Sequence, residues 1–382
     1  MAITARLAVE NRDPAAAIRS FLKMLLDRQV VSAILVSDHL PMKNAVMPAL
    51  VSDSDKLEGA DPLAPAFPMN AARLLSRLTR KKSGATIAAV LRPCEIRAFI
   101  ELVKLKQGSP EEVLLIGVDC LGAFGNTDYG RFAASGDGAG STLGFYRKIL
   151  GGEEGSWNGC DISPACKSCE YPVPEGADIA VGLLGNDIWT SLPLIANTEK
   201  GERALGGLDL PESEIPESRR EAVARLVGER AAYRDRMFES TGAAVSDVEK
   251  LMSYLGNCVN CYNCRVACPV CYCRECVFTT DVFDHEPVQY LRWAKRKGII
   301  KMPTDTVFYH LTRMAHMSTA CIGCGQCSNA CPNGVPVMEL FRTIAHGVQK
   351  AFAYTAGASL DDEPPLSAFR EKEFSEVTGG KD

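Results

Sequence analysis

The sequence predicts two folded parts, an α/β domain followed by a mainly helical, cysteine-rich domain. In the first half, short Val/Ile/Leu runs alternate with amphipathic segments. Five of the 16 cysteines lie before residue 170, and all the others lie between residues 258 and 331. A Gly/Pro/Glu-rich stretch and a charged amphipathic segment separate the two parts, which indicates a linker and a bridging helix.

The α/β domain is expected to span residues 1–200. Apolar runs and helical periodicities follow one another through this region, at 15–29, 31–37, 86–93, 94–108, 111–120 and 177–185. Short buried strands that alternate with helices are typical of a mainly parallel sheet. We expect the linker and bridging helix at 201–246, a cysteine-rich domain at 247–352, and a loose or partner-binding tail at 353–382.

Composition narrows the classes of function. The 382 residues include 46% hydrophobic and 23% charged residues and carry a formal net charge of -5. An acidic chain is a poor partner for nucleic acid, and no apolar run is long enough to span a membrane. The start of the sequence lacks a secretory pattern, so we expect a cytoplasmic protein. In a reducing compartment, cysteines serve metal or redox chemistry more often than disulfides.

Two cysteine runs share the spacing C-x2-C-x2-C-x3-C-P. This pattern is typical of two-cluster bacterial ferredoxins, in which the fourth cysteine of each run binds the other 4Fe–4S cluster. One cluster is then predicted on Cys258, Cys261, Cys264 and Cys331, and the other on Cys321, Cys324, Cys327 and Cys268. The alternatives are a pair of zinc sites or incidental buried cysteines, but two complete copies of the spacing argue against both, and zinc modules normally use paired C-x2-C knuckles.

Residues 269–320, between the two runs, include segments with helical character, so this domain should be more helical than a small ferredoxin. His310 and His316 lie in one of these segments. They either tune or approach a cluster, or they serve helix packing or face the solvent.

Two upstream cysteines stand at strand ends. Cys94 follows Pro93 at a strand-to-helix turn, and Cys120 ends an apolar run. The carboxyl ends of parallel strands are where open α/β sheets bind ligands, and a helix N-terminus favours an anionic group.

Here the chain resembles a known family. The segments PCEIRAF, GVDCLG and PACKSCEYPVPEGADIAVGLLG are similar to the beta subunits of coenzyme F420-reducing hydrogenases and F420-dependent formate dehydrogenases, and the C-terminal ferredoxin pattern most resembles the formate dehydrogenase branch. The resemblance implies an iron–sulfur flavoprotein with FAD beside a third 4Fe–4S cluster. It implies cluster ligands at Cys94, Cys120, Cys166 and Cys169, with Cys160 as a possible substitute for Cys120.

FAD binding rests on this resemblance alone, since no G-x-G-x-x-G motif follows a strand. Arg92 could place a cation beside the cluster or the flavin. In the segment 178–185, Asp178, Gly182 and Gly185 are candidates for close approach to the flavin. The alternative for that segment is a buried strand that ends in a glycine turn.

Four cysteines remain after twelve are assigned to three clusters. Cys271, Cys273 and Cys276 form CYCREC, and Cys160 lies upstream. They could supply a fourth cluster or a zinc site, with Cys160 or His285 as the outside ligand. Otherwise they are buried or partner-facing thiols.

The predicted function is that of an oxidoreductase subunit that converts hydride transfer at FAD into single-electron transfer through 4Fe–4S clusters. Coenzyme F420 is the expected hydride carrier, and a formate dehydrogenase or hydrogenase subunit is the expected catalytic partner. The alternative is a relay without a small-molecule substrate that joins such a subunit to a heterodisulfide-reductase-like complex.

Overall fold

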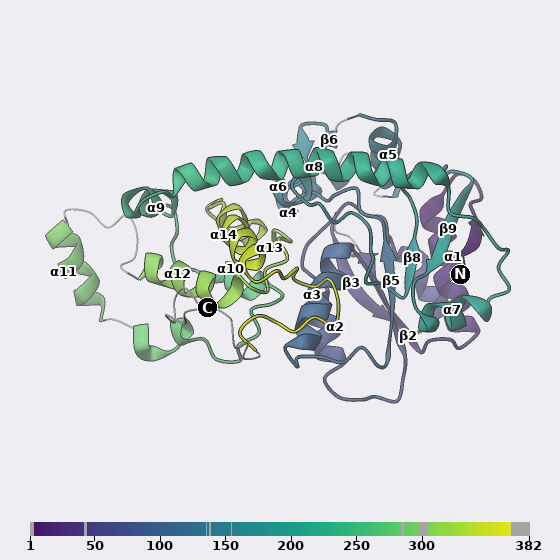
Figure 1. The fold of residues 1–382 in the computed structure, drawn as a ribbon, viewed down its shortest axis with the longest axis horizontal. Coiled ribbons are helices and arrows are strands. Elements are labelled where there is room, and N and C mark those ends of the chain that lie inside the picture. The colour runs from purple at the N-terminus through teal and green to yellow at the C-terminus, as the bar shows by residue number, and fades with distance from the viewer. Residues whose placement is uncertain are drawn as a thin grey trace, which may run out of the picture.

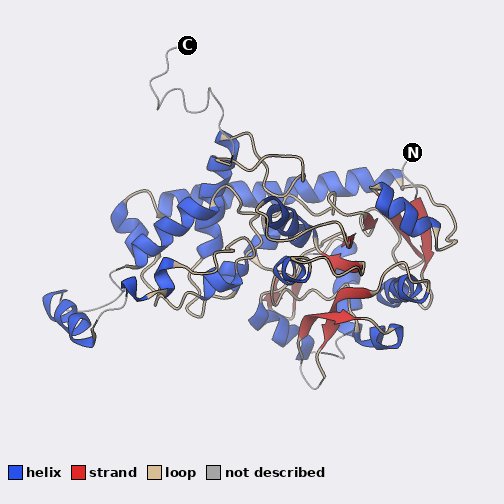
Figure 2. Cartoon of the chain, turned by 90° about the horizontal axis from the view of Figure 1, so that it is seen from below, coloured by secondary structure: helices blue, strands red, loops and turns tan. Residues whose placement is uncertain are grey.

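The chain forms two lobes joined by one long helix, as the computed structural model shows (Figure 1). The structure describes residues 4–41, 44–134, 136, 139–153, 155–283, 286–297 and 305–367. One lobe holds the strands, and the other is helical (Figure 2). This arrangement agrees with the predicted α/β part followed by a mainly helical part.

A seven-stranded sheet forms the centre of the first lobe, with the order β1-β9-β8-β5-β4-β2-β3. The strands are β1 (Thr4–Ala8), β2 (Ala33–His39), β3 (Val46–Val51), β4 (Ile87–Leu91), β5 (Val113–Val118), β8 (Ile179–Val181) and β9 (Ser191–Ala196). The four central strands β2, β4, β5 and β8 are parallel, whereas β1, β3 and β9 pair antiparallel at the edges. The sheet is thus parallel at its centre and mixed overall.

Helices cover both faces of this sheet. On β4, Ala88 and Val90 face one hydrophobic core, while Ala89 and Leu91 face another. The first core includes residues of α1 (Pro14–Asp27), α4 (Asn126–Ala134), α5 (Ala139–Leu150) and α7 (Glu199–Gly206). The second includes α2 (Ala72–Leu78) and α3 (Pro93–Lys104). The alternation of buried side chains along the strand explains this three-layer arrangement.

The first domain extends past residue 200. Helix α7 packs on β9 and buries Ala204 and Leu205, so residues 199–208 belong to the sheet domain and not to a linker. Helix α8 (Glu217–Ala244) then runs for 28 residues along both lobes. It corresponds to the predicted bridging helix. Small elements of the first lobe are η1 (Ser54–Gly59), β6 (Ser156–Trp157), β7 (Cys160–Asp161) and α6 (Pro164–Lys167).

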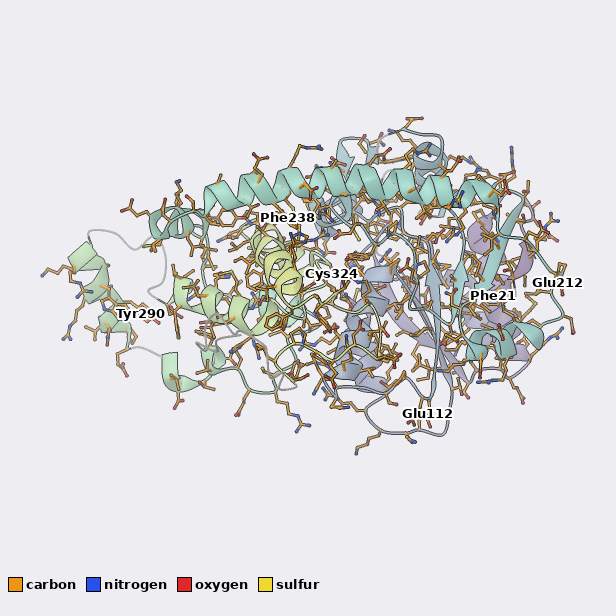
Figure 3. All side chains as sticks on the ribbon, viewed as in Figure 1. Phe21, Glu112, Glu212, Phe238, Tyr290 and Cys324 are labelled. Carbon is orange, nitrogen blue, oxygen red and sulfur yellow. The ribbon has the colours of Figure 1, made fainter. Side chains whose placement is uncertain are left out.

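The second lobe is built from short helices around its own core. They are α9 (Val248–Tyr254), α10 (Asn263–Ala267), η2 (Val277–Thr279), η3 (Asp281–Phe283), α11 (Pro287–Lys297), α12 (Thr306–Met317), α13 (Gln326–Asn329) and α14 (Val337–Ala351). Its core combines Tyr309, Met314 and Phe341 with several cysteines. Tyr290 on α11 lies at the far end of this lobe, and Cys324 lies between the lobes (Figure 3). No helix in the described part of the chain is long and apolar enough to cross a membrane.

The segment after α14 is not loose where the structure describes it. Tyr354 donates a 2.5 Å hydrogen bond to Glu101 on α3, and Arg97 donates two to the carbonyl of Ala356. The amide of Gly357 donates to Glu101 at 2.7 Å. This part of the predicted tail therefore fastens the second lobe to the sheet domain, while residues 368–382 lie outside the described ranges.

Candidate metal centres and ligand groove

The two cysteine runs of the second lobe fold in the same way. In each, the residue after the second cysteine has a positive φ, 59° at Tyr262 and 80° at Gly325, and begins a short helix that carries the third cysteine. These helices, α10 and α13, pack against each other. The left-handed turn brings nearby cysteines to one side of a tight loop, and the packing sets the two loops face to face.

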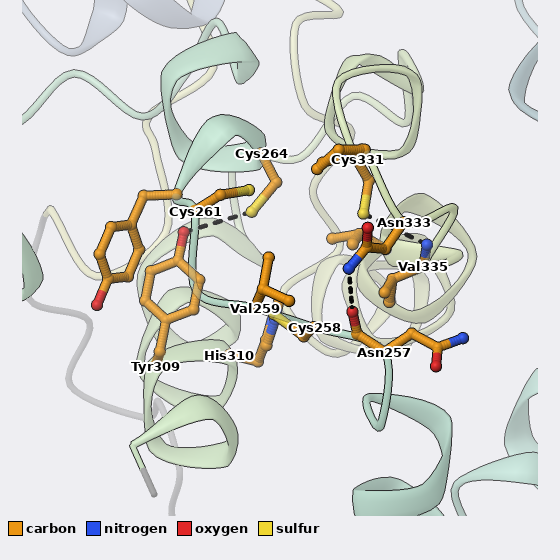
Figure 4. A pocket seen from close by; sticks show the side chains of 13 residues that line it. Asn257, Cys258, Val259, Cys261, Cys264, Tyr309, His310, Cys331, Asn333 and Val335 are labelled. Atoms are coloured by element: carbon orange, nitrogen blue, oxygen red, sulfur yellow. Dashed lines mark hydrogen bonds between the residues drawn. The ribbon is translucent and has the colours of Figure 1, made fainter. Parts of the chain in front are cut away.

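Cavity A is lined by Cys258, Cys261, Cys264 and Cys331 (Figure 4). Three of these cysteines come from the first run, and the fourth comes from the second run. The structure thus brings together the four side chains that the spacing grouped. Within the described residues, no three His, Cys, Asp or Glu side chains have a spacing suited to a single metal ion. In a four-iron cluster each thiolate binds a different iron, so the ligands surround a larger volume.

The sulfurs of cavity A have polar neighbours. Tyr309 Oη lies 3.3 Å from Cys264 Sγ, and His310 Nε2 lies 3.4 Å from Cys258 Sγ. The amide of Val335 donates to Cys331 Sγ at 3.3 Å (Figure 4). Such contacts stabilise negative charge on sulfur and so tune a cluster. Of the two histidines in this helix, His310 is buried at the cavity and His316 is exposed.

Cavity B is lined by Cys268, Cys321, Cys324 and Cys327, the second group that the spacing predicts. Burial is the largest cause that raises the pKa of each of these four thiols. Negative charge on neighbouring cysteines adds to it at Cys268, Cys324 and Cys327. Thiols of this kind are neutral until a metal displaces the proton. The donor set and its apolar surroundings therefore fit a group that binds four thiolates.

Arg313 on α12 lies between the two cavities. Its Nη1 donates to Cys264 Sγ of cavity A at 3.1 Å, and its side chain also lines cavity B. Burial opposes the charge, but the thiolates, Cys264 above all, hold the pKa of Arg313 above its usual range. Its Nε is buried without a hydrogen-bond partner among the described residues. A fixed cation thus stands where two anionic clusters would meet.

The four upstream cysteines come from three elements at the carboxyl edge of the sheet. Cys94 is in the first turn of α3, Cys120 follows β5, and Cys166 and Cys169 belong to α6 and the turn after it. After burial, charge on Cys166 is the largest cause that raises the pKa of Cys120 to about 11, and Cys169 adds to it. Charge on Cys120 and on Cys169 likewise adds to the causes that raise the pKa of Cys94. These four thiols are close enough to interact electrostatically.

Cys94 also connects the upstream cysteines with cavity B. Its pKa is raised by burial and Glu95, and further by charge on Cys120 and Cys324. Cys94 and Cys324 pack against the same hydrophobic core. The three cysteine groups therefore form a series in space: upstream cysteines, cavity B, cavity A.

Cys160, Cys271, Cys273 and Cys276 have different surroundings. Cys160 is buried in the core of the first lobe, where it pairs with Trp157 across a two-stranded sheet. Cys271 and Cys276 pack against the core of the second lobe, and Cys273 is exposed. Cys160 lies in the first lobe, whereas CYCREC lies in the second, so the structure does not bring them together as a shared metal site would need. His285, the other proposed outside ligand, lies outside the described residues.

The residues considered for flavin contact have different positions. Asp178 lies at the amino end of β8, where its carboxylate accepts from the amide of Leu115 and the hydroxyl of Thr198. It is therefore a structural residue at the edge opposite to the cysteines. Arg92 is half-buried and donates to the carbonyl of Ala64 at 2.6 Å. Burial opposes its charge, but Glu95 and then Cys120 keep the pKa of Arg92 above its usual value, so its cation does stand beside the upstream cysteines.

The two glycines allow close packing, Gly182 against β9 and Gly185 against α8. A Cβ on Gly182 would lie 2.8 Å from Pro193, and one on Gly185 would lie 2.4 Å from the backbone of Arg219. Gly185 also has a φ of +67°, which disfavours any side chain. This geometry supports the glycine-turn alternative, although Gly185 additionally lines a large groove.

That groove has a volume of about 970 Å³ and lies along α8 beside the upstream cysteines. Arg230, on its wall, donates to the carbonyls of Cys120 and Cys169 at 3.2 and 3.5 Å. Further cations and polar groups line it, namely Lys167, Arg225, Arg236, Asn186 and Tyr233. Small-molecule sites typically have volumes of about 300–1,000 Å³. The groove is therefore large enough for a dinucleotide-sized ligand.

The chain is similar to known proteins. Residues 316–337 match a family model described as a 4Fe-4S binding domain. The F420-dependent formate dehydrogenase subunit beta of Methanocaldococcus jannaschii is 24% identical over 92% of this chain and 93% of its own length. The F420-dependent formate dehydrogenase 1 subunit beta of Methanococcus maripaludis is 26% identical over 94% of each chain. The chain is thus similar to these beta subunits over nearly its whole length. A chain of the F420-reducing [NiFe] hydrogenase complex from Methanosarcina barkeri aligns with 65% of this chain and 94% of its own at 12% identity, with a TM-score of 0.47.

The resemblance predicted from three short segments is thereby confirmed over nearly the whole chain. A 4Fe–4S binding segment in the second lobe is likewise confirmed, at the second cysteine run. Sequence reasoning missed Arg313, Arg230 and the buried Asp119–Arg219 ion pair that joins α8 to the sheet. Only the position of Asp119, directly before Cys120, gave a local signal for any of them.

Proposed function

We propose that this chain is the electron-transfer subunit of a formate dehydrogenase or hydrogenase-type complex, with FAD in the groove along α8 and three 4Fe–4S clusters. The serial arrangement of the cysteine groups is the observation that carries the proposal. The groove contacts the upstream cysteines through Arg230, Cys94 adjoins Cys324, and Arg313 touches both ferredoxin cavities. A relay of this form would carry electrons between the groove and the far side of the second lobe.

In the groove, Arg225, Arg236 and Lys167 would hold the pyrophosphate of FAD, and Asn186 and Asp187 offer polar contacts for its sugar. When bound, a flavin exchanges a hydride with an organic carrier and single electrons with a metal centre. Arg230 fixes the carbonyls of Cys120 and Cys169 against the groove wall, so it positions the upstream site. By analogy with the names of the relatives, coenzyme F420 is the proposed hydride carrier.

Cavity A is the proposed exchange point with a partner subunit. Cys261 is exposed there, whereas the cysteines of cavity B are at most partly exposed. Val259 and Val266 nearby are 57% and 56% exposed. Exposed apolar side chains around an accessible ligand suit a surface that a protein partner covers. The subunit that carries the catalytic formate or hydrogen site would dock on this side, as would any heterodisulfide-reductase-like partner.

The test is the cofactor content and turnover of the anaerobically purified chain. The proposal predicts about 12 iron and one FAD per chain, from four irons in each of three ligand sets. It also predicts reduction of a viologen dye by reduced F420. Arg225→Gln with Arg236→Gln should lower FAD occupancy, while Arg220→Gln, an exposed arginine on the same helix outside the groove, should not. About 8 iron without flavin would favour the relay alternative and remove the upstream site.

A further inference from the structure

A strongly basic pocket lies on a different face of the chain, where the two lobes meet. Its volume is about 190 Å³. One wall comes from α2 and the residues after it, and the other from residues 265–274 of the second lobe. Five arginines line this arginine pocket: Arg73, Arg77, Arg80, Arg265 and Arg274.

The positive charge of the arginine pocket is not balanced by a carboxylate within it, since no Asp or Glu is among its described lining residues. In the described part of the chain, none of the five guanidinium groups forms an ion pair with a carboxylate. Arg73 donates to the carbonyl of Val266, Arg80 donates to Gln107 at 3.4 Å, and Arg265 Nε is buried without a partner there.

Such a concentration of like charge is unfavourable unless an anion is bound. Burial and then the charge of Arg77 lower the pKa of Arg73. The chain as a whole carries a net charge of -5, so five clustered arginines do not follow from its composition. A ligand with two or more negative charges would remove the mutual repulsion.

We propose that the arginine pocket binds the phosphoryl group of a small phosphorylated ligand. Guanidinium groups bind phosphate oxygens in bidentate fashion, and several can share one phosphate. The volume suits a phosphate or diphosphate group but is below the range of about 300–1,000 Å³ typical of whole-ligand sites. The rest of the ligand would extend outward past Tyr272, which lines the pocket and is 40% exposed.

The pocket couples this ligand to the ferredoxin lobe. Arg265 directly follows Cys264 of cavity A, and Pro269 directly follows Cys268 of cavity B. An anion held between α2 and these residues would tie the sheet domain to the loops of both cavities. Binding should therefore raise the melting temperature of the whole chain.

Inorganic pyrophosphate is the probe for this site. Its binding is measured by anaerobic calorimetry on the full, cluster-loaded chain, at low salt and at 0.15 M salt. We expect saturable 1:1 binding that weakens with salt, because the attraction is electrostatic. Arg77→Gln with Arg80→Gln removes two exposed arginines on the α2 side, away from the cysteine loops. This variant should bind at least about tenfold more weakly, because it loses two guanidinium groups that form charge-assisted hydrogen bonds with phosphate oxygens.

Three controls make the result decisive. Arg220→Gln, also an exposed arginine, should bind pyrophosphate like the wild type. The visible absorbance of the clusters and the FAD content of the double variant should equal those of the wild type. A second variant, Arg265→Gln, should weaken binding from the other wall of the pocket.

Several outcomes would overturn the proposal. The proposal fails if pyrophosphate shows no saturable binding at low salt, or if the double variant binds pyrophosphate as tightly as the wild type. It also fails if the double variant loses FAD, because the pocket would then be part of the flavin site. Binding of a glutamate-rich peptide without pyrophosphate binding would identify an acidic protein surface as the occupant. Nucleoside diphosphates that bind more tightly than inorganic pyrophosphate would support an organic phosphate, and equal affinity would support the free ion.

Discussion

Cavities A and B contain the same four-cysteine set but differ in their surroundings. Cavity A has the exposed Cys261 and polar neighbours on three of its sulfurs. Cavity B lies between the lobes, where burial is the main influence on all four thiols and Cys324 adjoins Cys94. Under the proposed function, one motif supplies both an internal relay and a surface exchange point. Position in the fold, and not the spacing, assigns these roles.

The largest expected effect comes from removing the internal site. Cys324→Ala should abolish the cluster of cavity B and slow electron transfer from the groove to an external protein acceptor by at least about a hundredfold, because the series is interrupted at its middle. The flavin should still be reduced by its hydride donor. Stopped-flow absorbance separates the two steps. Cys160→Ala, which removes a core cysteine outside the three groups, is the control. Unchanged transfer in Cys324→Ala would disprove the series.

Arg313 permits a finer test of the comparison. In Arg313→Gln the reduction potentials of both clusters should fall, because a nearby cation favours the reduced, more negative state. The fall should be about 60 mV at cavity A, equal to a tenfold change in a one-electron equilibrium, and smaller at cavity B. The reason is that Arg313 donates directly to Cys264. Redox titration followed by EPR measures both values, and Arg313→Lys should restore most of the loss. A larger shift at cavity B would contradict this placement.

The attachment of the lobes gives a medium-sized effect. Gly357 has a φ of +72°, and an added Cβ would lie 2.3 Å from the carbonyl oxygen of Arg97. Gly357→Ala should therefore destabilise the chain by about 1–3 kcal/mol. Gly347→Ala, inside α14 with nothing within 4 Å, should stabilise it by about 0.5–1 kcal/mol. Thermal melting compares the two. Equal melting temperatures would show that the C-terminal segment does not hold the lobes together.

The smallest effect concerns a region away from both cavities. The hydrogen bond from His39 to Asp61 raises the pKa of His39. The protonated pair therefore stabilises the fold below the unfolded pKa of about 6.5, and this contribution is lost as pH rises through the higher folded pKa. His39→Gln should lower stability at pH 6 by up to about 1 kcal/mol, and by less at pH 9. Melting temperatures at both pH values test this. A loss that grows with pH would have the wrong sign.

The sequence predicted those features that depend on local spacing. The central strands, the bridging helix and the two cysteine groups follow from patterns within short segments, because periodicity and turn geometry act locally. The antiparallel edge strands were not predicted, since strand direction depends on pairing partners. The docking of α7 and of Tyr354 was missed because their partners lie elsewhere in the chain.

The missed site residues have the same explanation. Arg313 meets Cys264 across 49 positions, and Arg230 meets Cys120 across 110. Nothing in the sequence near either arginine marks these contacts. Asp178 differs from the residue position expected for a ligand contact, because it lies at the amino end of β8, whereas the cysteines lie at the carboxyl edge of the sheet. The arginine pocket was also not predicted, because the net charge of -5 gave no reason to expect five clustered arginines.

The most direct measurement of the central claim compares EPR spectra of three reduced cysteine variants. Cys327 and Cys331 are neighbours in one run, yet they line different cavities, and Cys331 shares cavity A with Cys264 of the other run. Cys331→Ala and Cys264→Ala should therefore lose the same cluster signal, while Cys327→Ala should lose the other. If Cys331→Ala instead matched Cys327→Ala, each run would hold its own cluster, and the comparison between cavities A and B would be wrong.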